Sequence, residues 1–356
     1  MTGAVGATNS LSTLTATASS LTLGTSLKTT GAISLTADTI ALPTAVNTVT
    51  GGSITIQTQT ASRRLDIVAT ETGSNLELTP AEIASLKDGF SSVTLGRADG
   101  TGGISVATPV TFNDPVTLRS PNGGTINVAG QITGAGNSSV TLTSGASGLI
   151  QISSNIVTAG QAVALTGPVL LAADVSIDTT NSGSVTSGAA ISFSSTVDSS
   201  SATARSLQLL GGTGGAVTMT GAVGATNPLS SLQVTASSLT FGTSLATTGA
   251  ITLTADRLAL PTTVDSVSGG SITIQTQTAS RRLDIVASEI GSNLELTPAE
   301  IAALKNGFSS ITLGRSNGTG GINVGTSAIF NDPVTLRSPN GGTIDIAAGI
   351  TGVGDA

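Results

Sequence analysis

The feature that most constrains this chain is a long internal repeat. Residues 1–138 align without a gap onto residues 219–356, and 106 of the 138 aligned positions are identical. Most differences keep the character of the side chain, as in Val93 against Ile311 and Val128 against Ile346. The sequence therefore predicts one long repeat at 1–218 and an incomplete second copy at 219–356. We expect the two copies to form one continuous array rather than separate globular domains.

A second, shorter period lies inside each copy. Two apolar residues flank a polar one again and again, which indicates strands with one buried face; examples are Ile33-Ser34-Leu35, Ile54-Thr55-Ile56, Val93-Thr94-Leu95 and Val116-Thr117-Leu118. Apolar anchors recur at short, even intervals, so every third anchor lies about 20 residues further on. Three short strands per turn of about 20 residues predict an all-β fold, a parallel β-helix or β-solenoid that forms an elongated rod.

One segment in each copy has the signature of a short helix. In the segment from Leu78 to Gly89, Thr79 is the expected N-cap, Pro80 the first helical residue and Glu82 the partner in a capping box. Gly89 is the expected stop signal. The same arrangement recurs from Thr297 to Gly307. We expect this inserted helix to pack on the solenoid through Ile83 and Leu86.

Composition excludes several classes of protein. Only 9% of residues are charged, the net charge is −7, and the few basic residues are scattered, which argues against nucleic acid as a partner. No apolar stretch reaches the length of a membrane-spanning helix. The chain contains no Cys and no His, so thiolate metal sites and the commonest general base are absent. We therefore expect no enzyme, cofactor or metal site.

The candidate site residues are charged side chains in a repeated cluster. Arg64 and Asp66 are two positions apart and should point to the same outer face, as should Arg282 and Asp284 in the second copy. The ordinary interpretation is a surface ion pair, and the functional one is contact with a glycan or a protein partner. Asp99-Gly100 and Asn113-Asp114-Pro115 are interpreted as turns rather than calcium ligands.

The sequence resembles the filamentous-haemagglutinin-like repeats of very large secreted bacterial proteins. The resemblance covers essentially the whole chain and is carried by motifs such as Gly-Gly-Ser-Ile-Thr-Ile at 269–274 and Phe-Asn-Asp-Pro-Val-Thr-Leu at 330–336. It implies a right-handed parallel β-helix, placement outside the cell or on the bacterial surface, and a role in adhesion or surface fibres. No signal peptide is visible, and Met1 falls within a motif repeated at Met219, so we expect a fragment of a longer chain whose export route is unknown.

Three kinds of function stay open at this point. The first is a structural module of a surface fibre or adhesin that associates with further copies along the solenoid axis. The second is a module whose outer face binds glycans or a partner cell, although six Phe and no Trp or Tyr offer few aromatic platforms. The least favoured are a polysaccharide-degrading β-helix and an ice-binding protein, because the Thr-x-Thr triplets recur irregularly.

Overall fold

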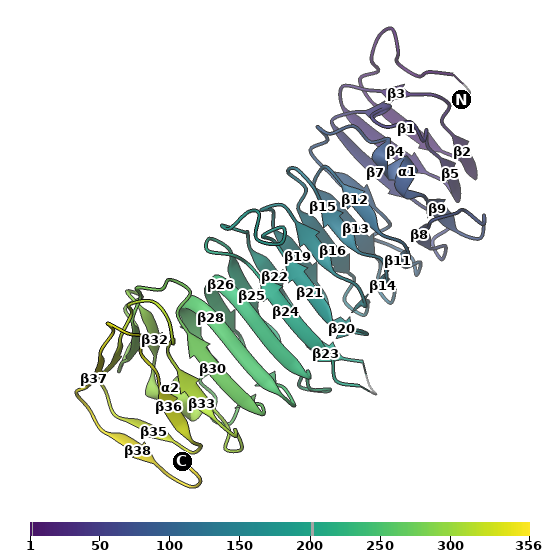
Figure 1. The fold of residues 1–356 in the computed structure, drawn as a ribbon. Coiled ribbons are helices and arrows are strands. Elements are labelled where there is room, and N and C mark those ends of the chain that lie inside the picture. Colours follow the sequence, from purple (N-terminus) through teal and green to yellow (C-terminus); the bar gives the residue numbers. More distant parts are fainter. Residues whose placement is uncertain (2, 201–202) are drawn as a thin grey trace. The chain divides into compact units, whose positions relative to one another are not determined.

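The computed structural model describes residues 1–356 except 2, 201 and 202. It shows an all-β parallel solenoid of about 15 coils, which confirms the predicted fold class (Figure 1). The chain divides into two compact units, residues 1–170 and 171–356. This boundary differs from the boundary between the sequence copies at 218/219, so the second unit begins with the last part of the first copy.

The coil of the first unit has three sides. The first side consists of β1 (Leu14–Thr17), β4 (Ala32–Thr36), β7 (Ser53–Gln57), β10 (Val93–Leu95), β13 (Val116–Ser120), β16 (Val140–Ser144) and β19 (Val163–Thr166). The second side consists of β2 (Ser20–Thr22), β5 (Thr39–Ala41), β9 (Leu76–Leu78), β8 (Leu65–Ile67), β11 (Ile104–Val106), β14 (Thr125–Val128) and β17 (Leu149–Ile152), and β20 (Val169–Leu171) crosses the unit boundary. The third side consists of β3 (Leu27–Lys28), β6 (Val49–Thr50), β12 (Val110–Phe112), β15 (Ile132–Gly134) and β18 (Ile156–Thr158).

The second unit is built in the same way. One side consists of β21 (Val175–Asp178), β24 (Ser206–Leu210), β26 (Ser231–Phe241), β28 (Ala250–Ala259), β30 (Ser271–Gln275), β33 (Ile311–Leu313) and β36 (Val334–Leu336). The strands β22 (Ile191–Phe193) and β25 (Ala216–Met219) stack onto the second halves of β26 and β28. The remaining strands are β32 (Leu294–Leu296), β31 (Leu283–Ile285), β34 (Ile322–Val324), β37 (Ile344–Ile346), β23 (Val197–Ser199), β27 (Leu245–Ala246), β29 (Val267–Ser268), β35 (Ala328–Phe330) and β38 (Ile350–Gly352).

Strand pairing explains the short period of the sequence. Equivalent residues of successive coils face each other in register, so Val93, Val116 and Val140 form one inward ladder and Leu95, Leu118 and Leu142 another. The residues of these two ladders are at most 1% exposed. Apart from one interruption, each step along this side spans a single coil of 19 to 24 residues, against the predicted length of about 20. Continuous apolar ladders form the core of each unit, while Thr, Ser and other polar residues point outward.

The coil is interrupted at an equivalent place in each unit, between β7 and β10 and between β30 and β33. In the first unit Ile54 pairs with Val93, so this step takes far more chain than the ordinary step from Ile33 to Ile54. The intervening chain first forms β8. It then returns toward the preceding coil, where β9 pairs in parallel with the edge of β8 that is opposite β11. Because the sequence contains no signal for such a reversal, the position of β9 before β8 in the stack was not predicted.

The predicted helix is present at this interruption as α1 (Pro80–Ala84), with α2 (Pro298–Ala302) at the equivalent place in the second unit. The capping box of Thr79 and Glu82 is confirmed, and Ile83 and Leu86 are buried. The predicted end at Gly89 is wrong. The helix ends at Ala84, with Ser85 as its C-cap, because Leu86 forms a β-bridge with Val49, and the amide of Lys87 then donates to the carbonyl of Val49.

Candidate functional site

The predicted charge cluster lies on the second side of the coil in each unit. Nη2 of Arg64 lies 3.3 Å from Oδ1 of Asp66, and Nε of Arg282 lies 3.4 Å from Oδ1 of Asp284. The structure therefore brings the predicted pairs together on one outer face. Nδ2 of Asn75 donates to the other carboxylate oxygen of Asp66 at 2.7 Å, a contact that the sequence did not indicate.

These contacts hold the loop that follows β8 against that strand. The Asp66 side chain is only 13% exposed, and its charge is balanced by Arg64, whose side chain is 48% exposed. Nη2 of the neighbouring Arg63 donates to the carbonyl of Ser74 at 3.0 Å, which fastens the same loop. Because the arginine is half-exposed, solvent screens this ion pair, which adds on the order of 1 kcal/mol to stability. Only the outer edge of Arg64 is free to meet a ligand.

A polar hollow of about 430 Å³ lies beside Arg64. Its lining includes Asn127 and Gln151, which lie on successive coils and follow Asp66 in register. The lining consists of Ser62, Arg64, Thr101, Gly103, Gly123, Gly124, Thr125, Asn127 and Gln151. Hydroxyl, amide and guanidinium groups of this kind can form hydrogen bonds with a polar ligand such as a sugar. No aromatic side chain lines the hollow, and all six Phe are buried in the core.

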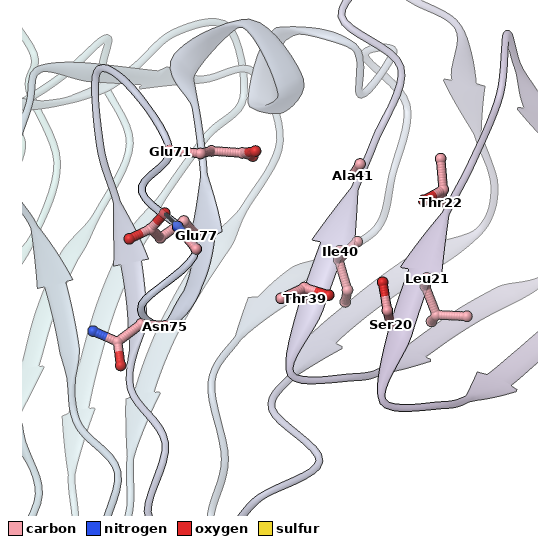
Figure 2. A pocket seen from close by; sticks show the side chains of 10 residues that line it. Ser20, Leu21, Thr22, Thr39, Ile40, Ala41, Glu71, Asn75 and Glu77 are labelled. Carbon is pink, nitrogen blue, oxygen red and sulfur yellow. Dashed lines mark hydrogen bonds between the residues drawn. The ribbon is translucent and has the colours of Figure 1, made fainter.

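The structure also assembles an acidic cluster at the interruption of the coil, which sequence reasoning missed. A cavity of about 90 Å³ lies between β5 and the segment leading to β9, and both Glu71 and Glu77 line it. Figure 2 shows the Glu71 side chain extending from its loop toward the end of β5 near Ala41. The available signal was the repetition of three glutamates at 71, 77 and 82 as 289, 295 and 300.

Each carboxylate of this cluster has a different environment. Oε1 of the buried Glu82 accepts the amide of Leu42 at 2.7 Å, and Oε2 accepts the amide of Thr79 at 2.8 Å. Burial opposes ionisation of Glu77, but hydrogen bonds from Thr72, Gly73 and Ser74 outweigh this effect and lower its pKa to about 2. Partial burial, the adjacent Glu82 carboxyl and the charge of Glu77 raise the pKa of Glu71 to about 7. Glu289 repeats this behaviour, also with a pKa of about 7.

The raised pKa of Glu71 predicts a pH dependence of stability. A carboxyl whose pKa is about 7 when folded, against 4.5 as its ordinary value, stabilises the fold fully below pH 4.5. That contribution is lost as the pH rises from 4.5 through 7. We expect the urea midpoint of the protein to fall between pH 5 and pH 8, and Glu71→Gln to reduce this fall. Much of the Glu71 residue is in contact with solvent, so the effect should be modest.

Urea unfolding at a series of pH values, followed by circular dichroism, measures this effect. Asp345→Asn is the matched control, since it also removes one negative charge but at an exposed position of β37. The control should leave the slope of stability against pH unchanged. Equal slopes in the wild type and in Glu71→Gln would contradict the interpretation.

The chain bends at both predicted turns, Asp99-Gly100 and Asn113-Asp114-Pro115. Gly100 and Gly318 have φ angles of +89° and +96°, a conformation that favours glycine. Asp114 is buried, and its Oδ1 accepts the amide of Gly89 at 2.8 Å, so this carboxylate fastens the turn after α1. Within the described residues no group of three acidic, His or Cys side chains is arranged to hold a metal ion. Among these residues no helix is long and apolar enough to cross a membrane.

Outward threonines align better than the sequence suggested. Thr94, Thr117 and Thr141 follow one another in register, and Thr55 precedes them. The neighbouring outward column is irregular, because Arg119 faces Thr143. A flat face of paired Thr columns is therefore not formed on this side of the first unit, and ice binding has no additional support from the register.

Comparison with known proteins identified no relative of this chain. No protein-family model, no curated protein and no solved structure matches the chain.

Proposed function

We propose that the chain is a structural repeat module of an extracellular or cell-surface fibre or adhesin, of the filamentous-haemagglutinin-like type found in large bacterial secreted proteins. The observation that carries this proposal is the in-register stacking of the coils within each unit, which recurs in two nearly identical sequence copies. Such a coil can be extended by duplication without redesign of its core, because each coil contacts mainly its neighbours. The module acts as a rigid spacer.

Self-association along the solenoid axis is the second part of the proposal. The observation behind it is the parallel pairing of strands from coil to coil, as between β14 and β17 and between β34 and β37. Strands of this kind offer backbone donors and acceptors along both edges, so strands of a second copy can pair with them in the same way.

Electron microscopy and light scattering over a concentration series test this proposal. We expect filaments or end-to-end oligomers of the wild-type chain. Ile346→Lys places a charge on the exposed strand β37 and should yield monomers with unchanged circular dichroism. Val264→Lys changes a similarly exposed apolar residue away from this edge and should assemble like the wild type. Monomers of the wild type at every concentration would refute the self-association.

A glycan- or partner-binding surface module is the second candidate. The polar hollow beside Arg64 favours it, while the burial of all six Phe weakens it because sugar sites commonly use aromatic platforms. Glycan-array binding that is lost in Arg64→Ala but retained in Arg257→Ala, which changes an exposed arginine outside this hollow, would support this candidate. An array without binding would leave the spacer function as the better account.

A further inference from the structure

All three lysines of the chain line two equivalent hollows. In the first unit Lys28 and Lys87 line a hollow of about 320 Å³, together with Thr50. In the second unit Lys305, the equivalent of Lys87, lines a hollow of about 340 Å³ at the same place in the coil. The two hollows lie at the corner between the third and first sides, beside the inserted helices.

Strand register fixes the arrangement of these side chains. Lys28 pairs with Thr50, and the bridge between Val49 and Leu86 places Lys87 beside Thr50 on the next coil. The outward residues Lys28, Thr50 and Lys87 therefore form a column with steps of about 4.8 Å. The Cα atoms of the two lysines are about 10 Å apart on this spacing, with the threonine between them. Two extended lysine side chains can converge on a group bound over Thr50.

The lysines of these hollows have no partner among the described residues. Across the part of the chain that the structure describes, none of the three lysine ammonium groups forms a hydrogen bond or an ion pair. Arginines such as Arg97, by contrast, are held by carboxylates and carbonyl groups. The hydroxyl of Thr50 is shielded from solvent and also has no partner among the described residues. The column thus consists of polar groups that form no hydrogen bond or ion pair with the described residues of the protein.

Acidic groups near the hollows differ between the two units. Asp88 lines the hollow of the first unit and lies against Asp114; burial, followed by the charge and hydrogen bond of Asp88, raises the pKa of Asp114. In the second unit the equivalent of Asp88 is Asn306. Conversely, the equivalent of Lys28 is Ala246. The first hollow therefore has two lysines and one carboxylate, and the second has one lysine and an amide.

We propose that each hollow binds a small oxyanion, a carboxylate or sulfate group, between its lysine and hydroxyl side chains. In the first unit Lys28 and Lys87 donate charge-assisted hydrogen bonds from both sides of an anion that lies over Thr50. In the second unit Lys305 and Ser268 hold the anion with one ammonium group fewer. This inference is independent of the proposed spacer function, since it concerns the outer surface and not the stacking of coils.

Nuclear magnetic resonance of the full chain tests the proposal directly. Labelling with ¹³C,¹⁵N-lysine yields only three side-chain signals, which single lysine substitutions assign. We titrate with sodium sulfate and with sodium galacturonate, and use sodium chloride at equal ionic strength and neutral galactose as controls. We expect the Lys28 and Lys87 signals to shift together and to saturate, and Lys87→Gln to abolish the shift of Lys28. The Lys305 signal of the same variant reports that the second unit is intact.

Substitutions that give one hollow a side chain found in the other provide a second test. Ala246→Lys adds the missing cation to the second hollow without adding a carboxylate, so it should tighten oxyanion binding there by about tenfold or more. Asp88→Asn should tighten binding in the first hollow. If the shifts saturate with sulfate but not with galacturonate, the ligand is a free anion. If they saturate with galacturonate as well, an acidic sugar supplies the bound group. Shifts that are linear, equal for all three lysines and reproduced by chloride would overturn the proposal, as would an Ala246→Lys variant without tighter binding.

Discussion

Leu118→Ala should lower the free energy of unfolding of the first unit by about 2–5 kcal/mol. Leu118 is fully buried and lies in the inward ladder between Leu95 and Leu142. Backbone pairing fixes the coils on either side of it, so the ladder cannot collapse into the space that the substitution leaves. We therefore expect the upper part of the range. Urea unfolding followed by circular dichroism, with hydrogen exchange to locate the loss, measures the effect.

Two matched substitutions give this prediction its controls. Thr117→Ala alters the outward neighbour of Leu118 and should change stability by no more than about 0.5 kcal/mol. Leu336→Ala alters the equivalent leucine of the second copy, which is only half-buried. Its cost should be clearly smaller than that of Leu118→Ala. Equal losses in all three variants would show that ladder position does not determine stability.

Glu82→Ala should destabilise the first unit by about 2–4 kcal/mol, because it leaves buried donors without acceptors. The Glu82 residue is 3% exposed, and its carboxylate joins the end of β5 to the start of α1 through the amides of Leu42 and Thr79. Without it, the amide of Leu42 should exchange with solvent much faster. Hydrogen exchange over residues 40–44 and urea unfolding are the measurements.

The conservative variant and the second copy test the cause of this loss. Glu82→Gln keeps one acceptor oxygen and should lose less stability than Glu82→Ala. Glu300→Ala should cause a similar loss in the second unit, since Oε1 of Glu300 accepts the amide of Leu260 at 2.8 Å. A stable Glu82→Ala variant whose Leu42 amide stays protected would contradict the role of this carboxylate.

Much of the fold could be predicted because its rules are local and repeated. The alternation of Ile33-Ser34-Leu35 determines which side chains point inward, and the short period determines how coils stack. The capping box of Thr79 and Glu82 was equally visible, since both partners lie within one turn of helix. The pairing of Arg64 with Asp66 followed from their spacing along one strand.

The features that were missed depend on residues far apart in the sequence. The strand β26 runs unbroken over 11 residues, while the equivalent segment of the first copy is divided into β1 and β2, although both contain Thr-Ala-Ser-Ser-Leu-Thr. The difference arises because β24 and β25 pair with β26. Likewise, the contact between Leu42 and Glu82 organises the acidic cluster, but it could not be predicted because the two residues are far apart in the sequence.

The reversed order of β9 and β8 has a consequence for the way the coils form during synthesis. Elsewhere on the first side, a strand can pair as soon as one further coil is made, so coils can be added one after another at nearly constant loop-closure cost. At the interruption, one edge of β8 stays open until Leu76 emerges, and Val49 lacks its partner in the following coil until Leu86 arrives. In nascent chains that stop before residue 86, the last coil therefore still lacks its pairing with the following coil. Chains that extend past β10 can complete that pairing.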